Sequence, residues 1–170
     1  MGFFVVRFLP SVRPLRTVVI RLLAVLLSLC GVVLADVGKV VGVHDGDTLT
    51  VLTESKESVK IRIFGIDAPE IGQPYGNSSK QALSTLVYGR LVDYSPDKKD
   101  FFGRIVSKVH NSDGEDVGLI MIQKGMAWYF RKYAKKETVY GEAQEKAKEE
   151  KLGLWNDPKP IEPWSWRKLK

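Results

Sequence analysis

The chain has 170 residues, of which 44% are hydrophobic and 27% are charged, a balance typical of a packed globular protein and unlike that of a disordered chain. Its 26 Lys and Arg residues outnumber 20 Asp and Glu residues, but four of the arginines lie in residues 1–35 and no acidic residue does. The remainder therefore carries a net charge of only +2. This excludes a uniformly basic surface that wraps duplex DNA, and any affinity for anions must come from local patches.

Residues 1–35 have the pattern of a secretory signal. Four arginines precede an uncharged apolar stretch, residues 22–35, that closes on small residues before Asp36. We therefore predict a signal peptide that is cleaved near Ala35, so that the chain is exported as a secreted or periplasmic protein. The alternative is an N-terminal membrane anchor, because the apolar stretch counted from Val18 approaches the lower limit for a bilayer span.

Cys30 is the only cysteine, and cleavage near Ala35 removes it. The mature chain then forms no disulfide and no thiolate metal site, so its stability must come from its core. Cysteine nucleophiles and zinc fingers are excluded as well.

The first half of the mature chain predicts strands. Residues 37–43 and 49–53 alternate apolar and polar side chains on either side of the turn dipeptide Asp45-Gly46, which is typical of a hairpin. Residues 59–66 give the strongest strand signal. Their alternation places Arg62 on the face opposite the apolar side chains.

The second half mixes helices and strands. A helix that begins at the possible cap Asn77-Ser78-Ser79 is predicted to end near residue 88, before Gly89. It is followed by strands 91–94 and 105–109 and by helices 117–124 and 139–151. The tail from residue 154 is rich in proline and holds three of the four tryptophans, so we expect it to lie against the domain.

This order predicts an α+β fold with about five strands and about three helices. A five-stranded barrel of the OB type, with a helix after its third strand, has the same order. We predict that residues 36–157 form this domain and that residues 158–170 are a C-terminal extension.

Two pairs of carboxylates stand at the ends of predicted strands. Asp45 and Asp47 lie in the hairpin turn, and Asp67 and Glu70 follow the long strand. An Asp at a turn is, by itself, most often a turn former. If the second and third strands pair, however, the two clusters meet at one end of the barrel and gather the oxygen ligands that a divalent cation prefers.

Two arginines accompany these carboxylates. Arg62 lies within the long strand, and Arg104 follows Gly103 at the start of a later one. Either can be an ordinary solvent-facing strand residue. Beside a carboxylate cluster, the pair suggests phosphate binding, because a planar guanidinium matches phosphate oxygens in a bidentate manner.

Five motifs carry a family resemblance. They are Asp-Gly-Asp-Thr at 45–48, Ile-Arg-Ile-Phe-Gly-Ile-Asp-Ala-Pro-Glu at 61–70, Phe-Gly-Arg at 102–104, Gln-Lys-Gly-Met-Ala at 123–127 and Lys-Glu-Glu-Lys-Leu-Gly-Leu-Trp at 148–155. In this order and spacing, they closely resemble the staphylococcal nuclease (thermonuclease) family. The match covers about residues 37–157, nearly all of the mature chain.

The resemblance implies a calcium-dependent phosphodiesterase on an OB-fold barrel, which cuts DNA and RNA and leaves 3′-phosphate ends. Carried across motif by motif, Asp47 and Asp67 would bind Ca²⁺ together with the Ala68 carbonyl. Glu70 would position or deprotonate the attacking water. In-line attack on a phosphodiester needs a polarising cation, an oriented water and donors for the equatorial oxygens, and these motifs supply each of them.

The resemblance further implies that Arg62 and Arg104 bind the phosphate and stabilise its extra charge in the transition state. The chain also departs from the family pattern. Alanine replaces threonine at Ala68, phenylalanine replaces tyrosine at Phe102, and the loop 71–76 is short and has no lysine. The last two changes bear on substrate affinity, since they remove phosphate contacts.

Residues 98–136 carry nine basic and four acidic side chains, with aromatic residues interspersed near the end. Aromatic residues beside basic ones suit unpaired bases and their phosphates. We therefore predict Tyr133 and Lys132 as substrate-binding residues of a monomer that takes single-stranded or locally melted DNA and RNA. Trp128 and Phe130 fit inward positions of a strand better.

Two other functions are compatible with parts of this pattern. An inert OB module that only binds single-stranded nucleic acid is expected to have lost one of the five acidic or arginine residues of the motifs, and none is lost. A surface-anchored interaction protein is supported only by the length of the N-terminal apolar stretch.

Overall fold

The computed structural model describes residues 35–96 and 98–169. The predicted signal or anchor segment therefore lies outside the described residues, apart from Ala35. Within the described ranges, no helix has the length and apolar character needed to cross a membrane. The described residues cluster as one compact unit.

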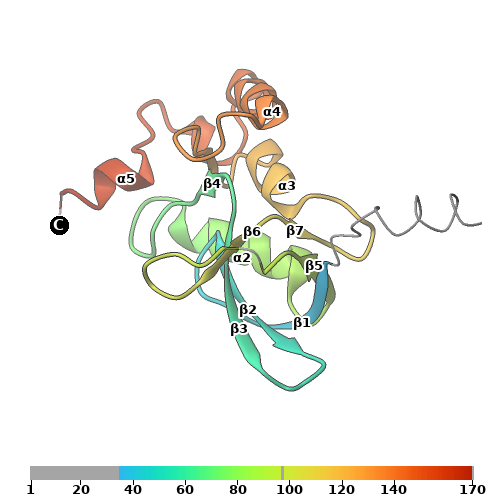
Figure 1. Ribbon diagram of the computed structural model, residues 1–170. Helices are drawn as coiled ribbons and strands as arrows, with labels where there is room; N and C mark the ends of the chain where they lie inside the picture. Colours follow the sequence, from blue (N-terminus) through green and yellow to red (C-terminus); the bar gives the residue numbers. More distant parts are fainter. Residues whose placement is uncertain (1–34, 97, 170) are drawn as a thin grey trace, which may run out of the picture. The chain divides into compact units, whose positions relative to one another are not determined.

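A curled six-stranded sheet forms the centre of this unit (Figure 1). Its strands lie in the order β6-β3-β2-β1-β5-β7, and every pair is antiparallel except the parallel pair of β3 and β6. The strands are β1 (Asp36–Val43), β2 (Thr48–Thr53), β3 (Ser58–Ile63), β5 (Leu91–Tyr94), β6 (Ile105–Ser107) and β7 (Val109–His110). A separate antiparallel pair consists of β4 (Ile66–Asp67) and β8 (Trp128–Tyr129).

The α+β OB-type class is confirmed, but the described residues form eight strands where about five were predicted, because two of the predicted strands are interrupted. The expected strand 59–66 ends at Ile63 because Gly65 takes a positive φ of 79°, which turns the chain before β4. The expected strand 105–109 divides at Lys108, where the chain exchanges β3 for β5 as its partner. Since β6 and β7 are the two edges of the sheet and only one residue separates them, the sheet must curl until its edges approach.

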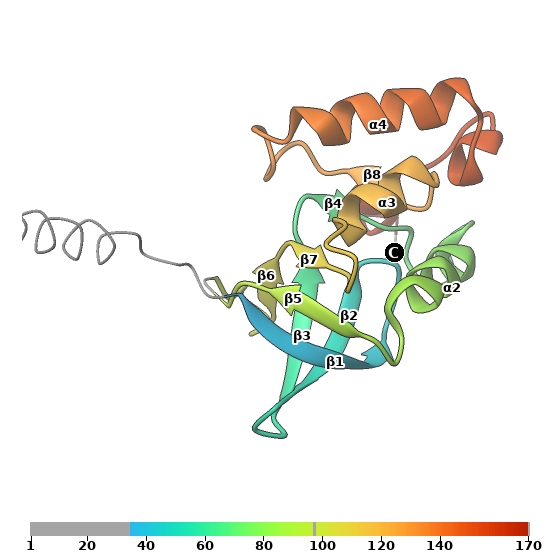
Figure 2. The ribbon, with the colours of Figure 1, turned by 90° about the vertical axis from the view of Figure 1, so that its right-hand side faces the viewer.

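The described residues contain four α-helices and one short 3₁₀ helix. These are α2 (Gly76–Val87), α3 (Val117–Gln123), α4 (Thr138–Glu149), η1 (Gly153–Asn156) and α5 (Pro163–Trp166). Figures 1 and 2 show α3 and α4 together at one end of the sheet, with the turn between β2 and β3 at the opposite end. The helices outnumber the predicted three because the C-terminal tail forms α5.

The predicted cap of α2 is wrong. The helix begins one residue earlier, after Tyr75 with its positive φ of 66°, and no side chain caps it. The hydroxyl of Ser79 donates instead to the carbonyl of Met126, 2.6 Å away, and so links α2 to the segment after α3.

The hydrophobic core lies inside the curl of the sheet, covered by α2, α3 and Tyr140 of α4. Its fully buried side chains include Leu49, Val51, Ile61, Ile63, Leu83, Val87, Met121 and Ile122. Ile61 and Ile63 point into this core as the alternation of β3 predicts. Arg62 between them is therefore directed away from it, toward the carboxylates described next.

Candidate active site

The turn between β1 and β2 is fixed by a hydrogen bond within it and by contacts with β3 and α2. The backbone N–H of Asp47 donates to the side chain of Asp45 at 3.0 Å, and the Asp47 carbonyl accepts from the N–H of Ile63 at 2.8 Å. Position 46 requires glycine, because a Cβ there would overlap the side chain of Ser79. The turn is thus fixed to the end of β3 and against α2.

The side chain of Asp47 is buried and satisfied on both oxygens. One oxygen accepts from the hydroxyl of Thr48 at 3.0 Å, and the other accepts from the backbone N–H of Ala68 at 2.7 Å. The second oxygen also forms an ion pair with Arg62 Nη1 at 2.7 Å. This carboxylate therefore joins the hairpin turn to the chain that leaves β4.

Arg62 connects the two predicted metal ligands. Its Nη1 contacts Asp47, and its Nη2 contacts Asp67 Oδ1 at 2.8 Å. Asp67 is 1% exposed and sits in β4, where pairing with Trp128 of β8 fixes its backbone. The sequence prediction that the two carboxylate clusters meet at one end of the barrel is borne out in this geometry, with one guanidinium between them.

Glu70 follows in a loop that closes tightly on itself. The N–H of Gln73 donates to the Glu70 carbonyl, and the N–H of Glu70 donates back to the Gln73 side chain at 3.0 Å. Gly76 is required because a Cβ there would overlap the Glu70 carbonyl. The loop thus holds a partly exposed carboxylate next to the buried pair, which suits a group that handles a water molecule.

A second arginine lies on this cluster, and sequence reasoning did not predict it. Arg167 Nη2 contacts Asp67 Oδ2 at 2.7 Å, and its Nη1 contacts Glu70 Oε1 at 2.6 Å. The hydrogen bonds to Asp67 raise the pKa of the Arg167 guanidinium, which stays charged. The sequence contained one indication of this contact: Arg167 belongs to the apolar C-terminal tail, which was predicted to lie against the domain.

Arg104 lies apart from these contacts. Its Nε and Nη2 both approach Asp100 Oδ2 at 2.7 Å, and its guanidinium lies 5.4 Å from the ring centre of Phe102. The structure thus pairs Arg104 within its own turn, whereas Arg62 and Arg167 are the arginines that contact Asp47, Asp67 or Glu70 in the described ranges.

The predicted substrate-binding residues lie in the loop after β8. Tyr133 is 64% exposed, and the Lys132 ammonium lies 5.4 Å from the centre of its ring. Phe130 packs edge-on against Tyr133 and stacks on Trp164 with ring centres 5.2 Å apart. Trp128 and Phe130 are both partly buried, but so is Tyr129 between them, and β8 ends at Tyr129, so the predicted strand alternation does not separate the three residues.

The carboxylates fit a hard divalent cation with few protein ligands. Asp47 and Asp67 offer oxygen atoms that one guanidinium now bridges, so they lie close enough to share a positive charge. In the described part of the chain, no three His, Cys, Asp or Glu side chains form a group able to hold a metal ion. A cation bound here would therefore complete its coordination with backbone carbonyls, water or substrate.

Burial raises the pKa of Asp47 to about 8, because desolvation of the carboxylate outweighs the attraction of Arg62. The folded protein then holds a proton that the unfolded chain has lost above its ordinary pKa of 3.8. In chelator, this extra proton stabilises the folded protein. Its contribution to the free energy of unfolding is complete below about pH 4 and is lost as the pH rises toward about 8.

We therefore expect thermal melts of the metal-free protein to show a midpoint that falls between about pH 5 and pH 8. The variant Asp47→Asn keeps the shape without the ionisation, and its midpoint should fall less over this range. Equal slopes for the two proteins would show that Asp47 titrates in its ordinary range.

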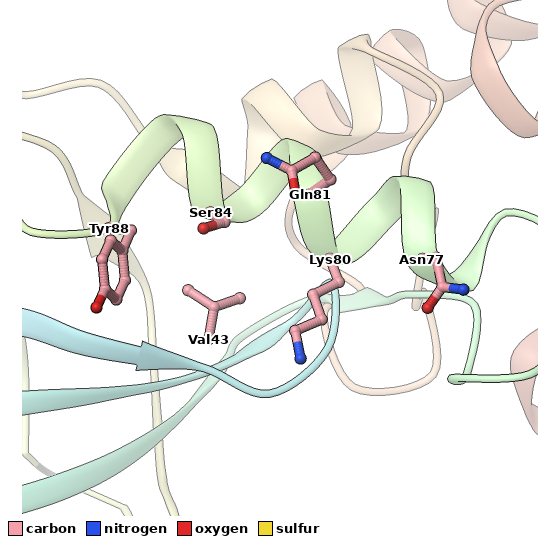
Figure 3. Close-up of a pocket in the computed structure, with 6 residues that line it drawn as sticks. All are labelled: Val43, Asn77, Lys80, Gln81, Ser84 and Tyr88. Carbon is pink, nitrogen blue, oxygen red and sulfur yellow. The ribbon is translucent and has the colours of Figure 1, made fainter.

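A shallow depression elsewhere on the surface does not take part in this site. It lies between α2 and the end of β1 (Figure 3) and is lined by Val43, Asn77, Lys80, Gln81, Ser84 and Tyr88. None of these residues belongs to the carboxylate and arginine cluster. The carboxylate and arginine cluster lies elsewhere, at the end of the barrel where Asp47, Asp67 and Glu70 are found.

Comparisons with known proteins match this region. The model of the staphylococcal nuclease homologue family matches residues 60–157. A Haemophilus influenzae protein named "Uncharacterized endonuclease" is 42% identical over 130 residues, which cover 76% of this chain and 72% of that protein. An Escherichia coli protein of the same name is 40% identical over 140 residues, or 82% of this chain and 90% of that protein.

A Shigella flexneri protein named "Micrococcal nuclease" is 35% identical over 140 residues, which cover 77% of this chain and 80% of that protein. The range matched by the family model includes Arg62, Asp67, Glu70 and Arg104. Asp47 and Arg167 lie outside it on either side.

Proposed function

We propose that this chain, which belongs to the staphylococcal nuclease family, is an exported, calcium-dependent nuclease that cuts DNA and RNA and leaves 3′-phosphate ends. Family membership makes the chain a nuclease, an enzyme that hydrolyses phosphodiester bonds. The observation that carries the proposal is the pair of buried carboxylates, Asp47 and Asp67, on the two nitrogens of Arg62, with Glu70 beside them.

The resemblance to the family gives each of these residues a task. Asp47 and Asp67 hold the cation, together with the carbonyl of Ala68, and Glu70 orients the attacking water or takes its proton. Arg62 and Arg104 bind the equatorial phosphate oxygens and stabilise the charge that develops on them. When bound, calcium supplies the charge that polarises the phosphate.

The substrate is a strand with unpaired bases. The exposed ring of Tyr133, beside the Lys132 ammonium, offers a stacking surface next to a phosphate-binding charge. A stacked base must leave its duplex partner, so single-stranded or locally melted DNA and RNA suit this surface. We propose that the protein acts as a monomer.

We expect cleavage to require calcium in the millimolar range, since two carboxylates and a carbonyl make a sparse site that leaves the other ligand positions to water or substrate. The purified protein is incubated with single-stranded and double-stranded DNA, in calcium or in excess chelator, and the product ends are identified by mass. Calcium-dependent products with 3′-phosphates support the proposal. Full cleavage in excess chelator would contradict the calcium requirement. Binding without cleavage would favour an inert nucleic-acid-binding module.

We further propose that residues 1–35 direct export and are then removed. The basic, apolar and small-residue segments described above support this proposal. Mass analysis of the expressed full-length chain should find a mature protein that begins at Asp36. An intact Met1 in the membrane fraction would instead identify the segment as an anchor.

A further inference from the structure

We propose that Arg167 is a further substrate-binding residue of this active site, which binds a phosphate group of the nucleic acid. The inference rests on the proposed function, and it concerns a residue outside the five motifs that carry the family resemblance. It assigns a role to the C-terminal segment, defined here as residues 157–169.

The contacts of Arg167 leave one edge of its guanidinium available. Its Nη1 and Nη2 bind the two oxygens of Asp67 at 3.3 and 2.7 Å, an end-on bidentate pair, and Nη1 also donates to Glu70 at 2.6 Å. These contacts use three of the five N–H donors. The other two, on Nε and Nη2, have no acceptor among the described residues and form the second fork of the guanidinium, which fits two phosphate oxygens.

The side chain is also accessible to a ligand. Arg167 is 44% exposed, whereas Arg62 in the same cluster is 15% exposed and has its outer nitrogens on Asp47 and Asp67. An arginine held by buried carboxylates on one edge and open to solvent on the other is preorganised, because its rotamer is set before substrate arrives.

The C-terminal segment is anchored beside the site by contacts on both sides of α5. The side chain of Gln73, in the loop after Glu70, donates to the carbonyl of Ile161 at 2.6 Å. Pro163 is buried, and Trp164 stacks on Phe130 at an interplanar angle of 6°. Arg167 is thus carried by a segment that is packed against the fold.

The same packing connects Arg167 to the predicted base-binding surface. Trp164 contacts Phe130, and Phe130 contacts Tyr133 with ring centres 4.9 Å apart. Because these contacts join the segment of Tyr133 to the segment of Arg167, we infer that a strand whose base lies on Tyr133 places a nearby phosphate toward Arg167. Phosphate binding by an arginine on such a surface positions the strand, and stacking holds the base.

The charges favour a phosphate as the ligand. Asp47, Asp67 and Glu70 face the guanidinium groups of Arg62 and Arg167. With a divalent cation on ionised carboxylates, this group has a net charge of +1, which complements the single negative charge of a phosphodiester. Without Arg167 the group is neutral and its attraction for the substrate weakens.

The test compares Arg167→Gln and Arg167→Lys with Lys168→Gln, an exposed neighbour that loses the same charge from the same segment. Binding of a fluorescent single-stranded oligonucleotide with a cleavage-resistant phosphorothioate backbone is measured in saturating calcium at several salt concentrations, so that Glu70, which contacts Arg167, keeps its charge in every protein. Steady-state cleavage kinetics follow for each substitution in the wild-type background.

We expect Arg167→Gln to weaken oligonucleotide binding by about tenfold or more, the effect of one charge-assisted hydrogen-bonded pair. The slope of log affinity against log salt should decrease by about one. Arg167→Lys should restore the slope but only part of the affinity, because lysine lacks the fork. Lys168→Gln should change binding little, and the kinetics should show the Arg167 effect mainly in KM.

Two results would overturn the inference while leaving the nuclease intact. If Arg167→Gln equals Lys168→Gln in binding and KM, Arg167 serves only to dock the tail. Alternatively, Arg167→Gln cleaves faster at low calcium with unchanged oligonucleotide affinity, in which case Arg167 blocks the cation site. A wild-type protein that neither binds nor cuts in calcium overturns the proposed function and this inference together.

Discussion

Glu70→Gln should lower the turnover of nucleic acid cleavage by about 10²- to 10⁴-fold, the usual contribution of a positioned general base. The substitution keeps the length of the side chain and an oxygen that can accept from Arg167, which contacts Glu70 at 2.6 Å. The loop should keep its shape as well, since the backbone of Glu70 forms its hydrogen bonds with Gln73. Turnover and oligonucleotide affinity are measured separately, and only turnover should change.

Glu149→Gln is the matched control, because Glu149 is an exposed residue of α4 and loses the same charge. It should leave both quantities unchanged. If Glu70→Gln retains turnover within about threefold of wild type, the barrier has changed by less than about 1 kcal/mol and Glu70 is only a turn residue.

Arg62→Lys should lower turnover by about 10²- to 10³-fold, a loss comparable with removal of one oxyanion donor. One guanidinium contacts Asp47 at 2.7 Å through Nη1 and Asp67 at 2.8 Å through Nη2. A lysine has a single nitrogen and cannot span both carboxylates while also binding phosphate. Its positive charge survives, so long-range attraction of substrate should be preserved, and kcat should fall much more than affinity.

Arg104→Lys tests the second arginine of the predicted phosphate clamp in the same way. Arg104 pairs with Asp100 in the described structure, so its part in catalysis depends on an exchange of Asp100 for phosphate. We expect its turnover to fall as well, whereas Lys132→Ala should mainly weaken binding and flatten the salt dependence. Near-wild-type kinetics for either arginine variant would remove that residue from the clamp.

Local periodicity is sufficient for much of this site. The alternation of residues 59–63 predicts that Ile61 and Ile63 are buried and that Arg62 faces the other way, because a strand has a period of two. Turn chemistry around Asp45 likewise predicts the hairpin that positions Asp47. These features depend on a few consecutive residues, and so they can be predicted from the sequence alone.

Strand boundaries needed more than periodicity. Residues 105–109 are predicted as one strand, but β6 joins β3 and β7 joins β5. The division at Lys108 follows from closure of the sheet, which depends on the partners that each half meets. The predicted cap of α2 was wrong for a related reason, since the Ser79 hydroxyl donates to the carbonyl of Met126, 47 residues away in the sequence.

The position of Arg167 depends on folding of the whole domain. It contacts Asp67 across 100 residues of sequence and Glu70 across 97. No local pattern encodes such a contact, because it depends on the stacking of Trp164 on Phe130 and on the hydrogen bond between Gln73 and Ile161. Composition shows that this apolar tail must be covered, and only the packing of its aromatic side chains brings its arginine to the carboxylates.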